Sequence, residues 1–172
     1  MAATDDRILG WFAGRIPAAW FIEAVTVQED RDEILVTGRL AEPSLPADCS
    51  AEARSEAQIG SIRAHREDTR EQRIRMAQEA ESRFGRKVAW GAACGERSEV
   101  FTSISVPVMT RLRMPERRVL DTLIDAGIAR SRSEALAWCV RLVGRHQSDW
   151  IEQLREAVAH VIRVRDEGPD IG

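Results

Sequence analysis

The chain has 172 residues, of which 44% are hydrophobic and 31% charged, and its formal net charge is −3 at pH 7. This is enough apolar material to bury a substantial core, so we expect one main domain and a smaller module. A mildly acidic balance argues against a protein that coats nucleic acid along its whole length. Because no apolar run approaches about 18 residues, no membrane-spanning helix is predicted.

The N-terminal residues and the cysteines indicate a cytoplasmic protein. The first residues lack both a basic start and a clean apolar core, so no signal peptide is predicted. Cys49, Cys94 and Cys139 are odd in number and widely spaced. That pattern fits a reduced compartment better than a disulfide framework. Arginine outnumbers lysine 24 to 1, a bias that indicates a high-GC bacterial genome.

The first part of the chain, residues 1–106, predicts an α+β domain. Apolar residues at helical spacing predict a helix over 5–21. Two runs rich in valine, isoleucine and threonine, 24–28 and 34–40, predict a hairpin around the charged turn at 29–33.

A long helix and a second hairpin are expected to complete this domain. After a proline-containing linker, the helix is predicted over 51–84, capped by Ser50 or Asp48 and ended by Gly85. Strands over 87–92 and 100–106 would then add to an antiparallel sheet.

The segment Pro115–Val143 predicts two short amphipathic helices joined at Gly127. Glycine stops a helix readily because it adopts positive φ without a Cβ penalty. Ser131 and Glu134 form a capping box that starts the second helix. Two such small helices cannot bury their apolar faces alone, so a second copy of the chain is expected. The predicted dimer core consists of Leu112, Leu120, Leu123, Leu136 and Val140.

Here the chain resembles the ribbon-helix-helix DNA-binding superfamily (MetJ, Arc and CopG types), over about residues 108–145. The similar residues are MTRLRM at 109–114, LDTL at 120–123, Gly127 and RSRSEAL at 130–136. The resemblance implies that two chains pair one strand each into a ribbon that enters the major groove of double-stranded DNA. A two-stranded ribbon fits that groove, and arginine can donate a bidentate pair to guanine.

The resemblance also implies which side chains contact DNA. Alternation along the strand would turn Met109, Arg111 and Arg113 toward the bases, and Thr110, Leu112 and Met114 toward the core. The start of the second helix would bind a phosphate through its amides and dipole. The residues implied there are Arg130, Ser131, Arg132 and Ser133. A competing strand register over 102–106 remains open, as does a simple protective role for the arginines on an edge strand.

Basic charge is concentrated in the same segment. Residues 1–106 hold 14 basic against 18 acidic residues, residues 107–147 hold 8 against 4, and residues 148–172 hold 3 against 6. Clustered positive charge is the expected footprint of phosphate binding. The distribution therefore favours the middle segment as the DNA-binding part.

Four arginines also recur at helical spacing within the predicted long helix. Arg63, Arg66, Arg70 and Arg73 would form one stripe, which could serve as a second phosphate-contacting surface. The alternative, which the neighbouring acidic residues favour, is a solvated face held by ordinary intrahelical ion pairs.

No enzyme is predicted, because no set of nucleophile, base and carboxylate occurs at a useful spacing. The three histidines are far apart without partners at ligand spacing, so neither a metal nor another cofactor is expected. A last helix over about 148–166, within the tail at 148–172, has one apolar side.

Together these features predict a cytoplasmic homodimer that binds DNA as a transcriptional regulator or chromosome-associated factor. An unknown ligand or protein could act on the N-terminal domain. The alternative function is a non-enzymatic assembly factor that uses the helices for dimerisation alone, in a complex that could contain RNA.

Overall fold

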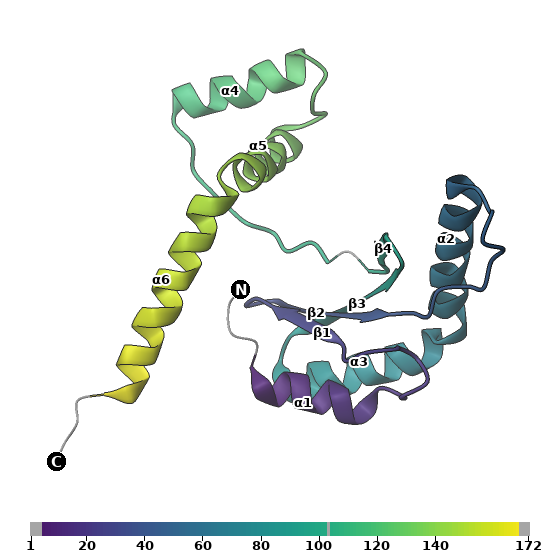
Figure 1. Ribbon diagram of the computed structural model, residues 1–172. Helices are drawn as coiled ribbons and strands as arrows, with labels where there is room; N and C mark the ends of the chain where they lie inside the picture. The colour runs from purple at the N-terminus through teal and green to yellow at the C-terminus, as the bar shows by residue number, and fades with distance from the viewer. Residues whose placement is uncertain (1–4, 103, 169–172) are drawn as a thin grey trace. The chain divides into compact units, whose positions relative to one another are not determined.

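The computed structural model describes residues 5–102 and 104–168, and there the chain is α+β, as predicted (Figure 1). These residues form two compact units, one up to residue 106 and one from Pro107 onward. The first contains α1 (Asp6–Arg15), β1 (Thr26–Glu29), β2 (Glu33–Arg39), α2 (Ala51–Asp68), α3 (Arg70–Phe84), β3 (Lys87–Cys94) and β4 (Arg97–Val100). The second contains α4 (Met114–Asp125), α5 (Arg132–His146) and α6 (Ser148–Glu167).

The four strands form one sheet in the order β1-β2-β3-β4. The outer pairs, β1 with β2 and β3 with β4, are antiparallel, but β2 and β3 are parallel, with Val36 opposite Trp90. The prediction of an antiparallel sheet is therefore wrong at its centre. The reason is the long helical connection through α2 and α3, which returns the chain to the end of the sheet where β2 began.

The core of this unit lies on one face of the sheet, where helices cover it (Figure 1). Phe12 from α1 meets Trp90 of β3 edge to face, with ring centroids 5.7 Å apart. Farther along β3, Ile62 from α2 packs on Ala92 and Cys94. Alternate residues of a strand point to one face, so β3 presents a continuous apolar row to the three helices. The main core cluster is Ile8, Phe12, Val27, Ile34, Val36, Met76, Ala80, Val88 and Trp90.

The first helix is shorter than the predicted span of 5–21. Asp5 caps its start by accepting a hydrogen bond from the backbone amide of Arg7 at 2.9 Å. The helix ends at Arg15, and the next residue, Ile16, has φ −74° and ψ 127°. Ile16 leaves the helical region because the ring of Pro17 would clash with a helical residue in front of it.

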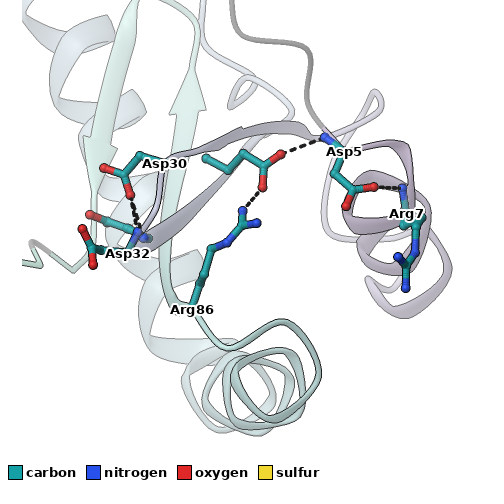
Figure 2. A network of polar contacts seen from close by, with 7 residues as sticks. Asp5, Arg7, Asp30, Asp32 and Arg86 are labelled. Carbon is teal, nitrogen blue, oxygen red and sulfur yellow. Dashed lines mark hydrogen bonds and ion pairs between the residues drawn. The ribbon is translucent and has the colours of Figure 1, made fainter. Parts of the chain in front are cut away.

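Polar contacts fix this helix to the first hairpin (Figure 2). One oxygen of Glu29 accepts a hydrogen bond from the backbone amide of Asp5 at 2.8 Å, and the other pairs with Arg86. In the turn, the Asp30 carboxylate accepts two backbone amides at 2.8 Å each, from residues two and three positions later. These amide bonds lower the pKa of Asp30. The hairpin predicted around residues 29–33 is confirmed.

The predicted long helix over 51–84 is broken at Thr69 into α2 and α3. The Thr69 hydroxyl donates to the carbonyl of His65 at 2.5 Å, and the Arg73 guanidinium donates to the carbonyl of Arg66 at 2.6 Å. Side chains that bond helix carbonyls in this way compete with the regular backbone ladder and bend it. The ends of the predicted helix are confirmed, since Ser50 caps α2 and Gly85 ends α3 at φ 70°.

The second hairpin is tighter than predicted. Gly95 adopts φ 55° in the two-residue turn between Cys94 and Arg97, so β4 begins already at Arg97. Two-residue hairpin turns of this kind favour glycine because they need positive φ. The predicted strand over 100–106 is therefore wrong at the described residues after Val100, where β4 ends; Ser103 lies outside the described residues.

The two short helices of the C-terminal unit are present, and the stop between them is where the sequence places it. Gly127 has φ 73°, its amide donates to the carbonyl of Ile124, and the next amide donates to the carbonyl of Leu123, both at 2.9 Å. This pair of bonds is a Schellman motif, which satisfies carbonyls that the end of α4 leaves free. Pro115 lies in the first turn of α4, where its missing amide costs nothing.

Candidate functional site

The segment before α4 is extended and presents its arginines outward. Leu112 packs against the core of the α4–α5 pair, whereas Arg111 and Arg113 on either side of it are exposed. Met109 is 97% exposed. Leu112 therefore faces the helices as predicted, but Thr110 is exposed, so the prediction that it also faces the core is wrong.

No strand is formed over 109–114 within the single chain, and the ribbon that two chains would form together stays a prediction. A strand needs a neighbour to bond with, and none of the described segments lies beside this one in the sheet. Met114 belongs to α4 and is exposed, so the prediction that it faces the core is wrong. The competing register over 102–106 also shows no strand at its described residues, and Ser103 lies outside them.

At the start of α5 the predicted hydroxyl cap is formed, but the carboxylate of the capping box bonds the amide before the N-cap residue instead of the N-cap amide itself. The Ser131 hydroxyl accepts from the amide of Glu134 at 3.2 Å, and the Glu134 carboxylate accepts from the amide of Arg130 at 2.8 Å. Within the described part of the chain, no acceptor meets the amides of Arg132 and Ser133. The Arg132 guanidinium makes a bidentate pair with Asp121, at 2.7 and 2.8 Å. The amides of Arg132 and Ser133 are thus free for a phosphate, whereas the predicted phosphate-binding amide of Arg130 and the Arg132 side chain are already paired.

The predicted dimer core is only partly buried in one chain. Leu120 is buried between α4 and α5, and Leu112, Leu123 and Leu136 are half-buried around it. Val140 on α5 is 65% exposed. An apolar surface remains uncovered on the helices of this unit, and it includes Val119, Ile128, Val140, Val143, Trp150, Leu154, Val158, Val161, Ile162 and Val164.

The arginine stripe lies at the junction of α2 and α3 and lines a cavity of about 600 Å³. Phe101 and Thr102, from the segment after β4, also line it, as does the exposed Ile74 of α3. Glu67 is the one carboxylate among the lining residues, against four guanidinium groups. The lining consists of Arg63, Arg66, Glu67, Arg70, Arg73, Ile74, Phe101 and Thr102.

Among the arginines that line this cavity Arg73 is the buried one, with only 6% of it exposed. Its Nε donates to the Thr69 hydroxyl at 2.9 Å, and its guanidinium lies 4.8 Å from the centre of the Phe101 ring. No carboxylate of the described residues lies within ion-pair distance of Arg73. Burial, followed by the charges of Arg66 and Arg70, lowers its pKa. A buried cation next to two like charges is costly unless an anion compensates it.

The sequence shows the arginine spacing but not what surrounds it. Phe101 and Thr102 come from a segment that the sequence assigns to a strand, far along the chain from α2. The break at Thr69 also has no marker besides the lack of apolar residues in the middle of the predicted helix. Only the folded chain places these groups around the arginines.

His65 lies behind the cavity, in an aromatic cluster with Trp20, Phe21 and Phe101, with ring centroids 5.0 to 6.4 Å away. Its Nε2 is buried and has no hydrogen-bond partner among the described residues. Burial, and then the charge of Arg73, lowers the pKa of His65 from its ordinary value of 6.5.

We expect His65→Phe to keep the ring contacts and raise the free energy of unfolding by about 1 kcal/mol, because it removes an unsatisfied buried nitrogen. Well above pH 6.5 the ring is neutral in both states. As the pH falls below that value, the unfolded chain takes up the proton first, so the native protein loses stability that the variant keeps. Urea unfolding of both proteins between pH 5 and 7.5 checks this; parallel pH profiles would contradict it.

Among the described residues no helix is both long and apolar enough to cross a membrane. Within the same ranges, no cluster of three or more histidine, cysteine, aspartate or glutamate side chains could hold a metal ion.

The chain thus combines an α+β unit that has a cationic cavity with a helical unit that has exposed arginines and an uncovered apolar surface. Residues 6–100 match the family model described as Rv1265-like protein, N-terminal domain, and residues 113–165 match the Mb1296 C-terminal domain. The chain belongs to the Rv1265-like family.

The relatives are mycobacterial. The chain is 50% identical over 161 residues to the uncharacterised proteins Mb1296 of Mycobacterium bovis and Rv1265 of Mycobacterium tuberculosis. The alignment covers 94% of this chain and 70% of each relative. No solved structure matches the chain.

Proposed function

We propose that the protein is a homodimer that binds double-stranded DNA through its C-terminal unit, as a transcriptional regulator or chromosome-associated factor. The observation that supports this best is the position of Leu112 between two exposed arginines in the segment before α4. Leu112 packs inward while Arg111 and Arg113 are exposed, and no carboxylate of the described residues is paired with either arginine. An extended segment with this pattern can bond to its copy in a second chain and present four arginines on one surface.

Two other features of the unit support the proposal. The uncovered amides of Arg132 and Ser133 at the start of α5 can bind a backbone phosphate, helped by the helix dipole. Residues 107–147 also hold eight basic and four acidic residues, in a chain that is otherwise acidic. Dimerisation would double this local positive charge, which raises the affinity for DNA and makes it strongly dependent on salt.

We expect Arg111→Ala and Arg113→Ala each to weaken binding to a selected target duplex by about 1–3 kcal/mol and to relax its sequence preference. The target is first obtained by selection from a random duplex library. Fluorescence anisotropy between 50 and 200 mM salt then compares the variants with the native protein. Arg163→Ala, an exposed arginine of α6, is the control and should change binding little.

If both alanine variants bind the target like the native protein, these arginines do not contact bases.

The assembly-factor alternative is favoured by α6, which buries none of its residues in the chain although Trp150 and Leu154 are apolar. Under that alternative the native protein binds no duplex at any salt concentration, whereas the proposed DNA-binding protein loses affinity steeply as salt rises.

A further inference from the structure

We propose that the cavity at the junction of α2 and α3 binds a small molecule with a terminal phosphate group, such as a phosphomonoester or a diphosphate. This site lies in the N-terminal unit and is separate from the proposed DNA-binding residues. Its ligand would contact the arginine stripe, which consists of Arg63, Arg66, Arg70 and Arg73.

The net positive charge of the residues that line the cavity favours the binding of an anion. Arg66 pairs with Glu99 at 2.9 Å, but Arg63, Arg70 and Arg73 have no carboxylate partner among the described residues. Glu67, the one acidic lining residue, cannot neutralise three guanidinium groups. Arginine matches phosphate oxygens with paired N–H donors, and such charge-assisted bonds are roughly twice as strong as neutral ones.

The guanidinium of Arg73 is already fixed in position to bind such a ligand. Its Nε and Nη2 each donate one bond, to the Thr69 hydroxyl and to the carbonyl of Arg66, and its face lies over the Phe101 ring. A guanidinium has five N–H donors, so the donors of Nη1 and one of Nη2 have no acceptor among the described residues. Because the side chain is already fixed, little conformational entropy is lost when an anion binds it.

The shape of the cavity favours a small molecule over a nucleic-acid backbone. The cavity volume of about 600 Å³ lies within the range of small-molecule sites. Arg73 is buried at its wall, so a group must enter the cavity to reach it. A terminal phosphate has three free oxygens and can do so, whereas a backbone phosphate has one charge and a sugar on each side. Ile74 and Phe101 offer apolar surface to the organic part of the ligand.

Isothermal titration calorimetry of the full chain with pyrophosphate at 150 mM salt tests the site. We expect saturable binding, and we expect Arg63→Gln with Arg70→Gln to weaken it at least about tenfold, since both lose charge-assisted bonds while neither is buried. Arg75→Gln together with Arg83→Gln, two exposed arginines of α3 outside the cavity lining, is the control with the same charge change. It should leave the affinity within about twofold.

Arg73→Lys gives a second test, because it keeps the charge and loses the paired donors. Weaker pyrophosphate binding with an unchanged circular dichroism spectrum supports the proposal. Three results overturn it. The native protein does not bind pyrophosphate, or the control variant binds it as weakly as the Arg63→Gln, Arg70→Gln variant does. In the third, the Arg63→Gln, Arg70→Gln variant keeps pyrophosphate binding and loses duplex DNA binding instead. Because pyrophosphate binding needs no DNA, failure here and failure of the Arg111 and Arg113 variants are separate results.

Discussion

Phe12→Ala should lower the free energy of unfolding of the N-terminal unit by about 3–5 kcal/mol, as expected for removing a buried aromatic side chain. Phe12 is 0% exposed and meets Trp90 edge to face, between α1 and the centre of the sheet. The loss combines the transfer free energy of the ring with the cavity that remains. Domains of this size are commonly stable by only about 5–15 kcal/mol, so much of the margin would be lost.

Urea unfolding followed by fluorescence measures this effect. The control is Ile22→Ala, which removes an exposed apolar side chain. A substitution at such a surface position should change the stability by no more than about 0.5 kcal/mol. If the two variants lose equal stability, α1 is not packed on the sheet as described, and the one-faced core of this unit would have to be reconsidered.

Local chemistry in the sequence was sufficient to predict the ends of several elements. Gly127 stops α4, Ser131 caps α5 and Ser50 caps α2 because these devices depend on residues within one helical turn. The turn around Asp30 is equally local, since its carboxylate binds amides two and three residues away.

The errors come from interactions between distant parts of the chain. The break at Thr69 depends on a hydroxyl and a guanidinium that take helix carbonyls, and the face of that guanidinium is covered by Phe101. The parallel pairing of β2 with β3 depends on where the two helices return the chain. Neither the helix break nor the parallel pairing produces a periodic pattern in the sequence from which it could be predicted.

The candidate sites also combine features that the local sequence predicts with features that depend on distant parts of the chain. The spacing of the four arginines in the stripe was visible, but the sequence favoured an ordinary solvated face because acidic residues lie nearby. In the folded chain Asp68 and Glu71 lie outside the cavity lining, and Glu67 is the one acid within it. The ribbon strand is a different case. One chain cannot provide the neighbour that such a strand needs, so a single copy leaves this prediction untested.

The second large effect is expected at the apolar surface of α5. Val140 and Val143 are 65% and 48% exposed, one turn apart on the same helix. The small α4–α5 core cannot cover them, and we propose that a second copy does so. Val140→Glu with Val143→Glu should then raise the dimer dissociation constant at least about 100-fold, because two charges would enter an apolar interface in each chain.

Sedimentation equilibrium from 1 to 100 μM measures the dissociation constant. Arg141→Glu is the matched control: it lies between the two valines, is exposed, and changes the charge of the chain by the same amount without placing a charge on the apolar surface. If the control dissociates equally, charge repulsion rather than apolar burial explains the loss. The double variant should also lose DNA binding, since each chain would supply one strand of the ribbon and neither strand forms alone. A native protein that is monomeric throughout this range would remove both the dimer and the ribbon from the proposed mechanism.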